Sequence, residues 1–368
     1  MSRSDVAGPG GRSLSVAQSL DLGAFLLMSL RHGALNLGTL MLFSFWGRSE
    51  TRRRIWAASA LGGDRLVYGG SGAELLVGFS LKLLIAGGAL AFAVASVRGL
   101  ETWGAVGALA AGAGAIFALG FCRFVGFVYL ASRTEWRGAA FEVEGSSRRF
   151  AMDELRAAAM NILTLGWWRP RADRLRAERL WGGLRHQGLA LWYDPAAARR
   201  RPLYSAFAIG WFGSVMVLLF AAGVLLGLDA GLFPTPELGA APSGDQLAAL
   251  AGLGAGAWLA VSAAWAPYRA ALRSATAAAL GLRLSATWRE CARLEVENVL
   301  LRIVSLGALA PLAQAREAAF LFSHLGGGRL SNPARVARLS PDACKASVMT
   351  RGKVHAVHAA DLRERASL

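Results

Sequence analysis

The sequence predicts an all-α integral membrane protein in which two transmembrane helical hairpins alternate with two or three repeated interfacial or re-entrant motif helices. Hydrophobic residues make up 54% of the chain and its mean hydropathy is +0.39, as is typical of membrane proteins. Four apolar runs are long enough to cross a bilayer. A stretch near the N-terminus also returns later in the chain, which indicates a repeat architecture.

The clearest self-similarity joins the segment 36–56 to the segment 161–181, which starts 125 residues later. This shift aligns Asn36 with Asn161 and Thr39 with Thr164. One shift that holds over more than thirty residues predicts that the two segments fold alike. The other matches are Leu40 with Leu165, Phe43 with Trp168, Arg54 with Arg179, Trp56 with Trp181, Gly63 with Gly188, Leu66 with Leu191, and Tyr68 with Tyr193.

A third and weaker copy lies 266 residues after the first, at about residues 286–328. It has lost the arginines of the two strong copies, which cover about residues 31–72 and 150–193. The sequence leaves open whether this third segment is a true repeat. The residues that match the second copy are Ser305 with Thr164, Gly307 with Gly166, and Pro311 with Pro170.

Each copy has an apolar run, then a break marked by Gly or Pro, then a basic or amphipathic helical stretch. The apolar runs are shorter than the roughly 20 residues that span a bilayer, so we expect an interfacial or re-entrant position. Tryptophans beside the breaks, such as Trp46, would then lie at the headgroups. Asn36 and Asn161 are expected to cap helices or to hydrogen-bond across them, which is a structural role.

Three groups of residues give the chain a family likeness. They are the Thr164-Leu165-Gly166-x-Trp168-Arg169-Pro170 motif, the Ser44-Phe45-Trp46-Gly47-Arg48 motif with its arginine-rich helix, and the closing Gly-x-x-Leu-x-Tyr. Together they resemble the bacterial YjgN-like family of inner-membrane proteins, a domain of unknown function. The chain departs from the pattern at Met41, in place of a glycine, and at Arg171, in place of a tryptophan. The resemblance covers most of residues 22–330 and implies an inner-membrane, multi-pass architecture, but no reaction.

The long apolar runs are predicted to pair as hairpins. An acidic loop at 229–245 without Lys or Arg separates the last two runs. Because basic residues beside spans mark the cytoplasmic side, we expect this loop to face outward and the arginine-rich connections to face the cytoplasm. The segment 22–46 is expected not to cross, since Arg31 near its middle would be costly in the bilayer; the alternative in which it crosses stays open. The predicted spans are 73–97, 103–132, 203–228 and 246–267.

The remaining segments are predicted to be tails. Residues 1–20 are rich in Gly, Ser and Arg and read as a disordered N-terminal tail, whereas 331–368 read as a cytoplasmic C-terminal tail. The membrane domain would therefore cover 21–330. The three cysteines show neither disulfide nor metal spacing. No catalytic motif is present, so we expect no enzyme activity, no metal and no cofactor.

Two charges inside the predicted spans, Lys82 and Arg123, are candidates for binding an anion. Both are predicted to lie roughly 12 Å deep on the cytoplasmic side of the first hairpin, at 1.5 Å per helical residue. No Asp or Glu lies within either span to pair with them. They could hold an anionic headgroup or solute; alternatively, their long side chains reach back to the interface.

The basic motif helices are the second candidate site, since arginine beside tryptophan suits an anionic leaflet. Nucleic acid would also attract such charge. The sequence contains no recognised nucleic-acid-binding fold, so we expect no nucleic-acid partner. The candidate residues are Arg52, Arg53, Arg54, Arg174, Arg176 and Arg179.

The sequence favours a non-enzymatic envelope protein whose basic helices bind anionic membrane lipids. The alternative is a transporter or channel for a small anionic solute or lipid, for which Lys82 and Arg123 would line the path. Small residues at helical spacing, such as Gly252 and Gly256, would allow close helix contacts. The sequence leaves open whether the chain forms a homo-oligomer.

Overall fold

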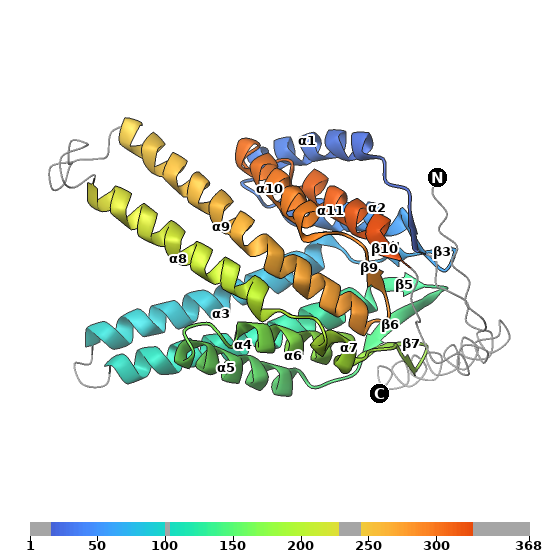
Figure 1. The fold of residues 1–368 in the computed structure, drawn as a ribbon, viewed down its shortest axis with the longest axis horizontal. Coiled ribbons are helices and arrows are strands. Elements are labelled where there is room, and N and C mark those ends of the chain that lie inside the picture. Colours follow the sequence, from blue (N-terminus) through green and yellow to red (C-terminus); the bar gives the residue numbers. More distant parts are fainter. Residues whose placement is uncertain (1–15, 100–103, 228–243, 327–368) are drawn as a thin grey trace, which may run out of the picture. The chain divides into compact units, whose positions relative to one another are not determined.

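The computed structural model describes residues 16–99, 104–227 and 244–326, and in this part the chain is mostly helical (Figure 1). Part of the predicted disordered tail is ordered instead. Val16–Gln18 form strand β1, which pairs antiparallel with β2 (Ser59–Leu61). Residues 1–15 of that tail, the predicted C-terminal tail at 331–368 and most of the acidic loop lie outside the described residues.

Four helices of the described part are long and apolar enough to cross a membrane. Helix α3 packs along α4 and α8 packs along α9, as Figure 1 shows. Few side chains in the most apolar stretch of each helix are buried inside the protein, as expected for helices that face lipid. The helices are α3 (Gly72–Gly99), α4 (Gly104–Ser132), α8 (Tyr204–Gly227) and α9 (Gly244–Ala279).

The helix that contains the last predicted span is longer than that span. The predicted span ends at residue 267, but α9 continues through Pro267 to Ala279. A proline lacks the N–H for one helical hydrogen bond and normally kinks or ends a helix. The guanidinium of Arg269 donates to the carbonyl oxygen of Ser262 at 2.6 Å, in the turn before the proline. The carbonyl that the proline leaves without a helical N–H is that of Ala263, so this contact adds a hydrogen bond in the same turn but does not replace the missing one.

Three helix–turn–helix units accompany the long helices, and we call them the first, second and third unit. Helix α5 packs on α4, α10 packs on α9, and α1 packs on α11. The first unit thus contacts the third although they are far apart in sequence. The units are α1 (Leu22–Gly38) with α2 (Ser44–Ala57), α5 (Ser147–Leu163) with α6 (Arg169–Trp181), and α10 (Trp288–Val304) with α11 (Ala310–His324); a short α7 (Pro195–Arg199) follows the second.

Short antiparallel strands lie before and after the units, so the all-α prediction was incomplete. They were missed because each has only two to five residues, too few for an alternating pattern. Gly63 and Gly188 of the Gly-x-x-Leu-x-Tyr signature adopt positive φ (89° and 77°) at hairpin turns. One sheet has the order β4 (Val67–Tyr68), β5 (Thr134–Trp136), β6 (Ala139–Val143), β7 (Leu184–His186) and β8 (Leu189–Ala190); β3 (Asp64–Arg65) pairs with β2, and β9 (Arg283–Leu284) with β10 (Leu325–Gly326).

The sheet holds the first hairpin to the first two units. Trp136, Phe141 and Leu184 are buried together on it. The indole N–H of Trp136 donates to the carbonyl oxygen of Leu61 at 3.0 Å, which joins the larger sheet to the smaller one. A second core, around Phe207 and Tyr268, joins α8 to α9 and contacts Trp167 of the second unit.

Candidate functional site

The turn inside each unit is built by one hydroxyl side chain. In the second unit the Thr164 hydroxyl donates to the carbonyl oxygen of Met160 at 2.7 Å and accepts from the N–H of Trp168 at 3.0 Å. The hydroxyl thus ends one helix and begins the next. The same bonds are made by Thr39 with Leu35 and Phe43 (2.7 and 3.0 Å) and by Ser305 with Leu301 and Leu309 (2.6 and 3.1 Å).

A leucine in the left-handed region follows each of these hydroxyl residues. The φ angles are 49° at Leu40, 51° at Leu165 and 50° at Leu306. A residue other than glycine in this region costs on the order of 1 kcal/mol. The next residue also has positive φ and is Gly166 or Gly307 in two of the units. In the first unit it is Met41, at the position where the family pattern has glycine, so this turn carries an additional strain.

These strained leucines are among the most exposed apolar side chains of the described residues. Leu40 is 87% exposed, Leu165 76% and Leu306 94%. Large contiguous apolar surface marks contact with a membrane or a partner. The other exposed apolar residues of the turns and adjoining helix ends are Leu37, Met41, Leu42, Ile162, Leu163 and Val304. We call these three surfaces the apolar tips.

At least two of the tips lie beside apolar helices that could cross a membrane. The indole N–H of Trp211 donates to the carbonyl oxygen of Leu165 at 2.9 Å. Trp211 is seven residues into α8, which is roughly 10 Å along its axis. Next to the first tip, Phe45 packs against Phe79, seven residues into α3, with ring centroids 5.2 Å apart. The tips are therefore level with the apolar part of the long helices.

The expectation that Arg123 lacks an acidic partner is wrong. Its Nη1 lies 2.7 Å from Oε2 of Glu154. The acid comes from α5, which packs against α4, so a search within the spans could not find it. Arg176 binds the same carboxylate at 2.7 and 2.9 Å and also pairs with Asp173. Lys82 is exposed on α3 and makes no hydrogen bond or ion pair with any residue that the structure describes.

Burial of Arg176 lowers its pKa, but the hydrogen bonds and charge of Glu154 outweigh this effect and raise the pKa above its usual value. The guanidinium is therefore held firmly in its charged form. Asp173 is buried and also accepts a hydrogen bond of 2.7 Å from the Tyr268 hydroxyl of α9. The second unit is thus tied to both long hairpins through acidic side chains.

The other arginines predicted to bind anions also contact protein groups. Arg54 pairs with Glu50 at 2.9 Å and Arg179 with Asp153 at 3.2 Å. Such pairs leave less charge for an external ligand. Arg52 donates to the Tyr68 hydroxyl (3.3 Å), Arg53 to the Gly70 carbonyl oxygen (3.4 Å), and Arg174 to the Arg201 carbonyl oxygen.

Two further exposed arginines near the turns, Arg48 and Arg171, belong to the basic motif segments but were not among the candidate residues. The first lies over the ring of Phe45 at 5.9 Å and the second over the ring of Trp168 at 5.0 Å. Neither has an ion pair with a described residue. Their signal was present in the sequence as a basic residue three positions after an aromatic one near a turn.

The predicted structural residues have mixed outcomes. Thr39, Thr164 and Gly166 build the turns, and Pro170 is fully buried in the first turn of α6. Trp46 is 44% exposed, and its ring and backbone leave room only for glycine at Gly72. The expected hydrogen bonds of Asn36 and Asn161 are not found: within the described residues neither carboxamide oxygen, although buried, has a partner.

The third unit carries a different charge pattern at the same positions. A shift of 141 residues, which aligns Thr164 with Ser305, also aligns Glu154 with Glu295 and Arg176 with Glu317. Both of these carboxylates bind Arg273 of α9, with 3.2 Å to Glu295. Glu295 also binds Arg269 at 2.8 Å. In the first unit the same positions are Ser29 and Thr51, whose buried hydroxyls donate to the backbone carbonyl oxygens of Phe25 and Gly47.

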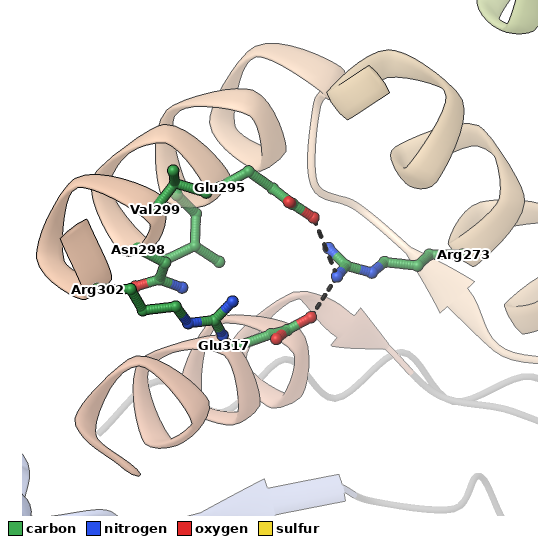
Figure 2. Close-up of a pocket in the computed structure, with 7 residues that line it drawn as sticks. Arg273, Glu295, Asn298, Val299, Arg302 and Glu317 are labelled. Atoms are coloured by element: carbon green, nitrogen blue, oxygen red, sulfur yellow. Dashed lines mark hydrogen bonds and ion pairs between the residues drawn. The ribbon is translucent and has the colours of Figure 1, made fainter. Parts of the chain in front are cut away.

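A small pocket lies within this cluster, between α9, α10 and α11 (Figure 2). Its volume is about 40 Å³. Nη1 of Arg273 and Oδ1 of Asn298 are buried and have no hydrogen-bond partner in the described part of the chain. The Arg302 guanidinium, which also lines the pocket, makes no ion pair or hydrogen bond with the described residues either. The lining residues are Arg273, Leu294, Glu295, Asn298, Val299, Arg302 and Glu317.

Comparison with protein families identifies this architecture. A family model described as a bacterial protein of unknown function, DUF898, matches residues 22–340. The chain belongs to the DUF898 family. YjgN-like is the known name of this family, so the resemblance seen in the sequence is confirmed. The match includes all three units and the four long helices of this DUF898 protein. Searches of the curated proteins and of the solved structures each found no match.

Proposed function

We propose that this DUF898 protein is a multi-pass protein of the bacterial inner membrane whose three units are copies of one repeat and dip their apolar tips into one leaflet, where they bind anionic lipids. The observation that carries the proposal is the strained, exposed leucine at the end of each tip. Strained backbone persists where function requires it. Three equivalent leucines favour a common apolar environment as that function.

The energetics support insertion. Burying one leucine side chain in an apolar phase contributes on the order of 2 kcal/mol, which is comparable to the strain of the left-handed backbone at Leu40, Leu165 or Leu306. Each tip also exposes further apolar side chains. The backbone hydrogen bonds of the turn are largely made internally by Thr39, Thr164 or Ser305, as a bilayer requires of any backbone that enters it.

Anionic headgroups are the ligands that suit the base of each tip. Arg48 and Arg171 each stack on an aromatic ring near a turn. An arginine beside an aromatic side chain suits the headgroup region of an anionic leaflet. The role is one of binding and membrane organisation, not catalysis. In this proposal the hairpins α3–α4 and α8–α9 cross the membrane and hold the units at its surface.

The alternative of a transporter or channel has lost its main support. It depended on two unpaired cations at one depth in the first hairpin, but Arg123 is paired with Glu154. Lys82 alone does not define a path, because its exposed side chain can reach the interface. We therefore favour lipid binding.

Depth-dependent fluorescence quenching tests the insertion of the tips. A fluorophore attached at Leu165→Cys or Leu306→Cys in bilayers should be quenched by lipids that carry a quencher on the acyl chain. The same fluorophore at Asp64→Cys, on the exposed strand β3, should not be quenched. Equal quenching at the three sites would contradict tip insertion.

Melting experiments test the lipid preference. Phosphatidylglycerol or cardiolipin should raise the thermal midpoint in detergent above its value in phosphatidylcholine, and Arg171→Asn should reduce this rise. Arg293→Gln is the matched control, since that exposed arginine pairs with Glu297 of its own helix at 2.7 Å. Equal midpoints in all lipids would show that anionic lipids are not specifically bound.

A further inference from the structure

The pocket of the third unit has unused hydrogen-bonding groups of both kinds. Within the described residues, Arg273 Nη1 is a buried donor without a partner, and Asn298 Oδ1 is a buried acceptor without one. The Asn298 side chain is 5% exposed, and its Nδ2 donates to the carbonyl oxygen of Ala313 at 3.3 Å. Buried polar groups normally have partners. The pocket therefore suits an occupant that both donates and accepts hydrogen bonds.

The charge of this region favours an anion over a cation. Three guanidinium groups (Arg269, Arg273 and Arg302) face two carboxylates (Glu295 and Glu317), which leaves one positive charge. Both carboxylates are already engaged by Arg269 or Arg273. Among the groups that the structure describes, Arg302 is the one without an acidic partner, and its side chain is half-buried at the wall of the pocket.

The size of the pocket decides how an occupant can enter. A volume of about 40 Å³ holds a group the size of water, which needs about 10–15 Å³. A hydroxyl group fits within it, whereas a phosphate group is larger and would stay at the rim, beside Arg302. Figure 2 shows Asn298 and Arg302 on α10, across the pocket from Arg273 on α9.

Position in the unit explains how a lipid would reach this pocket. Arg302 is one helical turn before the exposed Leu306 of the third tip. It replaces Asn36 and Asn161 of the other two units. If the tip inserts as proposed above, Arg302 lies where the tip meets the headgroups.

We propose that this pocket binds a phosphoglycerol group: the phosphate accepts hydrogen bonds from Arg302 at the rim, and a glycerol hydroxyl enters the pocket, donates to Asn298 Oδ1 and accepts from Arg273 Nη1. The inference rests on the proposed lipid-binding function and names the headgroup. Phosphatidylglycerol in the membrane or soluble glycerol phosphate can supply this chemistry.

Native mass spectrometry of the full chain in detergent tests the inference. Wild type should retain phosphatidylglycerol about tenfold better than phosphatidic acid, which has the phosphate but no headgroup hydroxyl. Arg302→Asn should lose about tenfold in phosphatidylglycerol retention. Asn298→Ala should keep binding but lose the preference between the two lipids. Both variants introduce the residue found at the same position of the second unit, Asn161 or Ala157, so the fold should accept them.

The outcomes separate the two proposals. Unchanged phosphatidylglycerol retention in Arg302→Asn would overturn the pocket assignment. If Arg171→Asn lowered retention of anionic lipids in that case, the general proposal would stand and the pocket assignment alone would fail. If wild type retained no anionic lipid, both would fail. Competition by glycerol phosphate but not by inorganic phosphate would identify the soluble compound as a source of the same group, and equal competition by the two would overturn the role of the hydroxyl.

Discussion

The second and third units share a backbone but hold their neighbouring long helix with opposite charge patterns. In the second, Glu154 lies between two arginines, Arg123 of α4 and Arg176 of α6. In the third, Arg273 of α9 lies between two glutamates. The turns agree in hydrogen bonds and in φ. The backbone of the unit is thus set by the turn, while the charges on its helices are free to invert as long as the packed helix supplies the opposite sign.

The inversion also changes which carboxylates stay paired when one arginine is removed. Glu154 keeps one arginine if the other is removed, and Asp173 adds a further acid in the second unit. Among the described residues, Arg273 is the sole ion-pair partner of Glu317, whereas Glu295 also pairs with Arg269. Loss of Arg273 should therefore leave one carboxylate of the third unit unpaired, whereas loss of Arg123 should leave none unpaired in the second.

The largest expected effect is that of Arg273→Ala. Removing one partner of a buried ion pair costs several kcal/mol, but the side chains of Arg273 and Glu317 are 25% and 34% exposed, so water screens part of the effect. We expect a loss of about 2 kcal/mol in the free energy of unfolding. Reversible unfolding in mixed micelles with a rising fraction of denaturing detergent would measure it.

Arg123→Ala is the matched variant in the second unit. It should cost less than about 1 kcal/mol, because Arg123 is 54% exposed and Arg176 still binds Glu154. Equal losses for the two variants would show that the bridging arginine has no special role in the third unit.

A charge exchange should partly rescue the third unit. Glu317→Arg in the Arg273→Ala background gives the third unit the Glu–Arg pattern of the second. We expect the double variant to regain about 1 kcal/mol relative to Arg273→Ala alone, as measured by a double-mutant cycle. Glu317→Gln in the same background is the control, since it removes the repulsion between carboxylates without adding a pair. If both double variants were equally stable, the ion pair itself would contribute nothing.

The turns should respond alike in the two units. Thr164→Ala and Ser305→Ala each remove a hydroxyl that accepts a backbone N–H at the start of a helix. Loss of such a cap costs about 1 kcal/mol, and we expect the two unfolding free energies to fall by similar amounts. A large loss for one variant and none for the other would mean that the shared geometry does not reflect a shared contribution to stability.

Much of the fold followed from the sequence because its signals are local. Apolar runs predicted the four long helices, and the Thr164 and Ser305 breaks predicted the turns of two units. The span predicted to end at residue 267 lies in a helix that continues to Ala279, which the apolar pattern did not predict. The strands were too short to show a period.

The charges of the site could not be predicted in the same way. Whether Arg123 is paired depends on which face of α5 packs on α4, and that register is a tertiary property. The inverted pattern at Glu295 and Glu317 likewise has meaning only once Arg273 of α9 is known to lie between them. The third unit resembled the other copies only weakly in sequence because Glu317 stands at the position of Arg176. The arginine of the ion pair, Arg273, lies on the long helix α9 instead.

The smallest expected effect is a pH dependence of stability that arises in the strands after the second unit. His186 of β7 is buried between Trp136 and Phe141, with both ring nitrogens unpartnered among the described residues. Burial, together with the nearby charge of Arg137, lowers its pKa from the usual 6.5. The unfolded chain therefore binds a proton that the folded chain does not. The stability should be full above pH 6.5 and should fall as the pH drops below 6.5.

Thermal midpoints between pH 7.5 and pH 5.5 would measure this dependence. His186→Phe should flatten the part of the profile that lies below pH 6.5, because a phenyl ring fits between the same aromatic rings and takes up no proton. His324→Gln, at the end of α11 in the third unit, is a histidine substitution away from these strands and serves as the comparison. If His186→Phe kept the full dependence, the proton would be taken up elsewhere, and the acid sensitivity would not belong to the strands of the second unit.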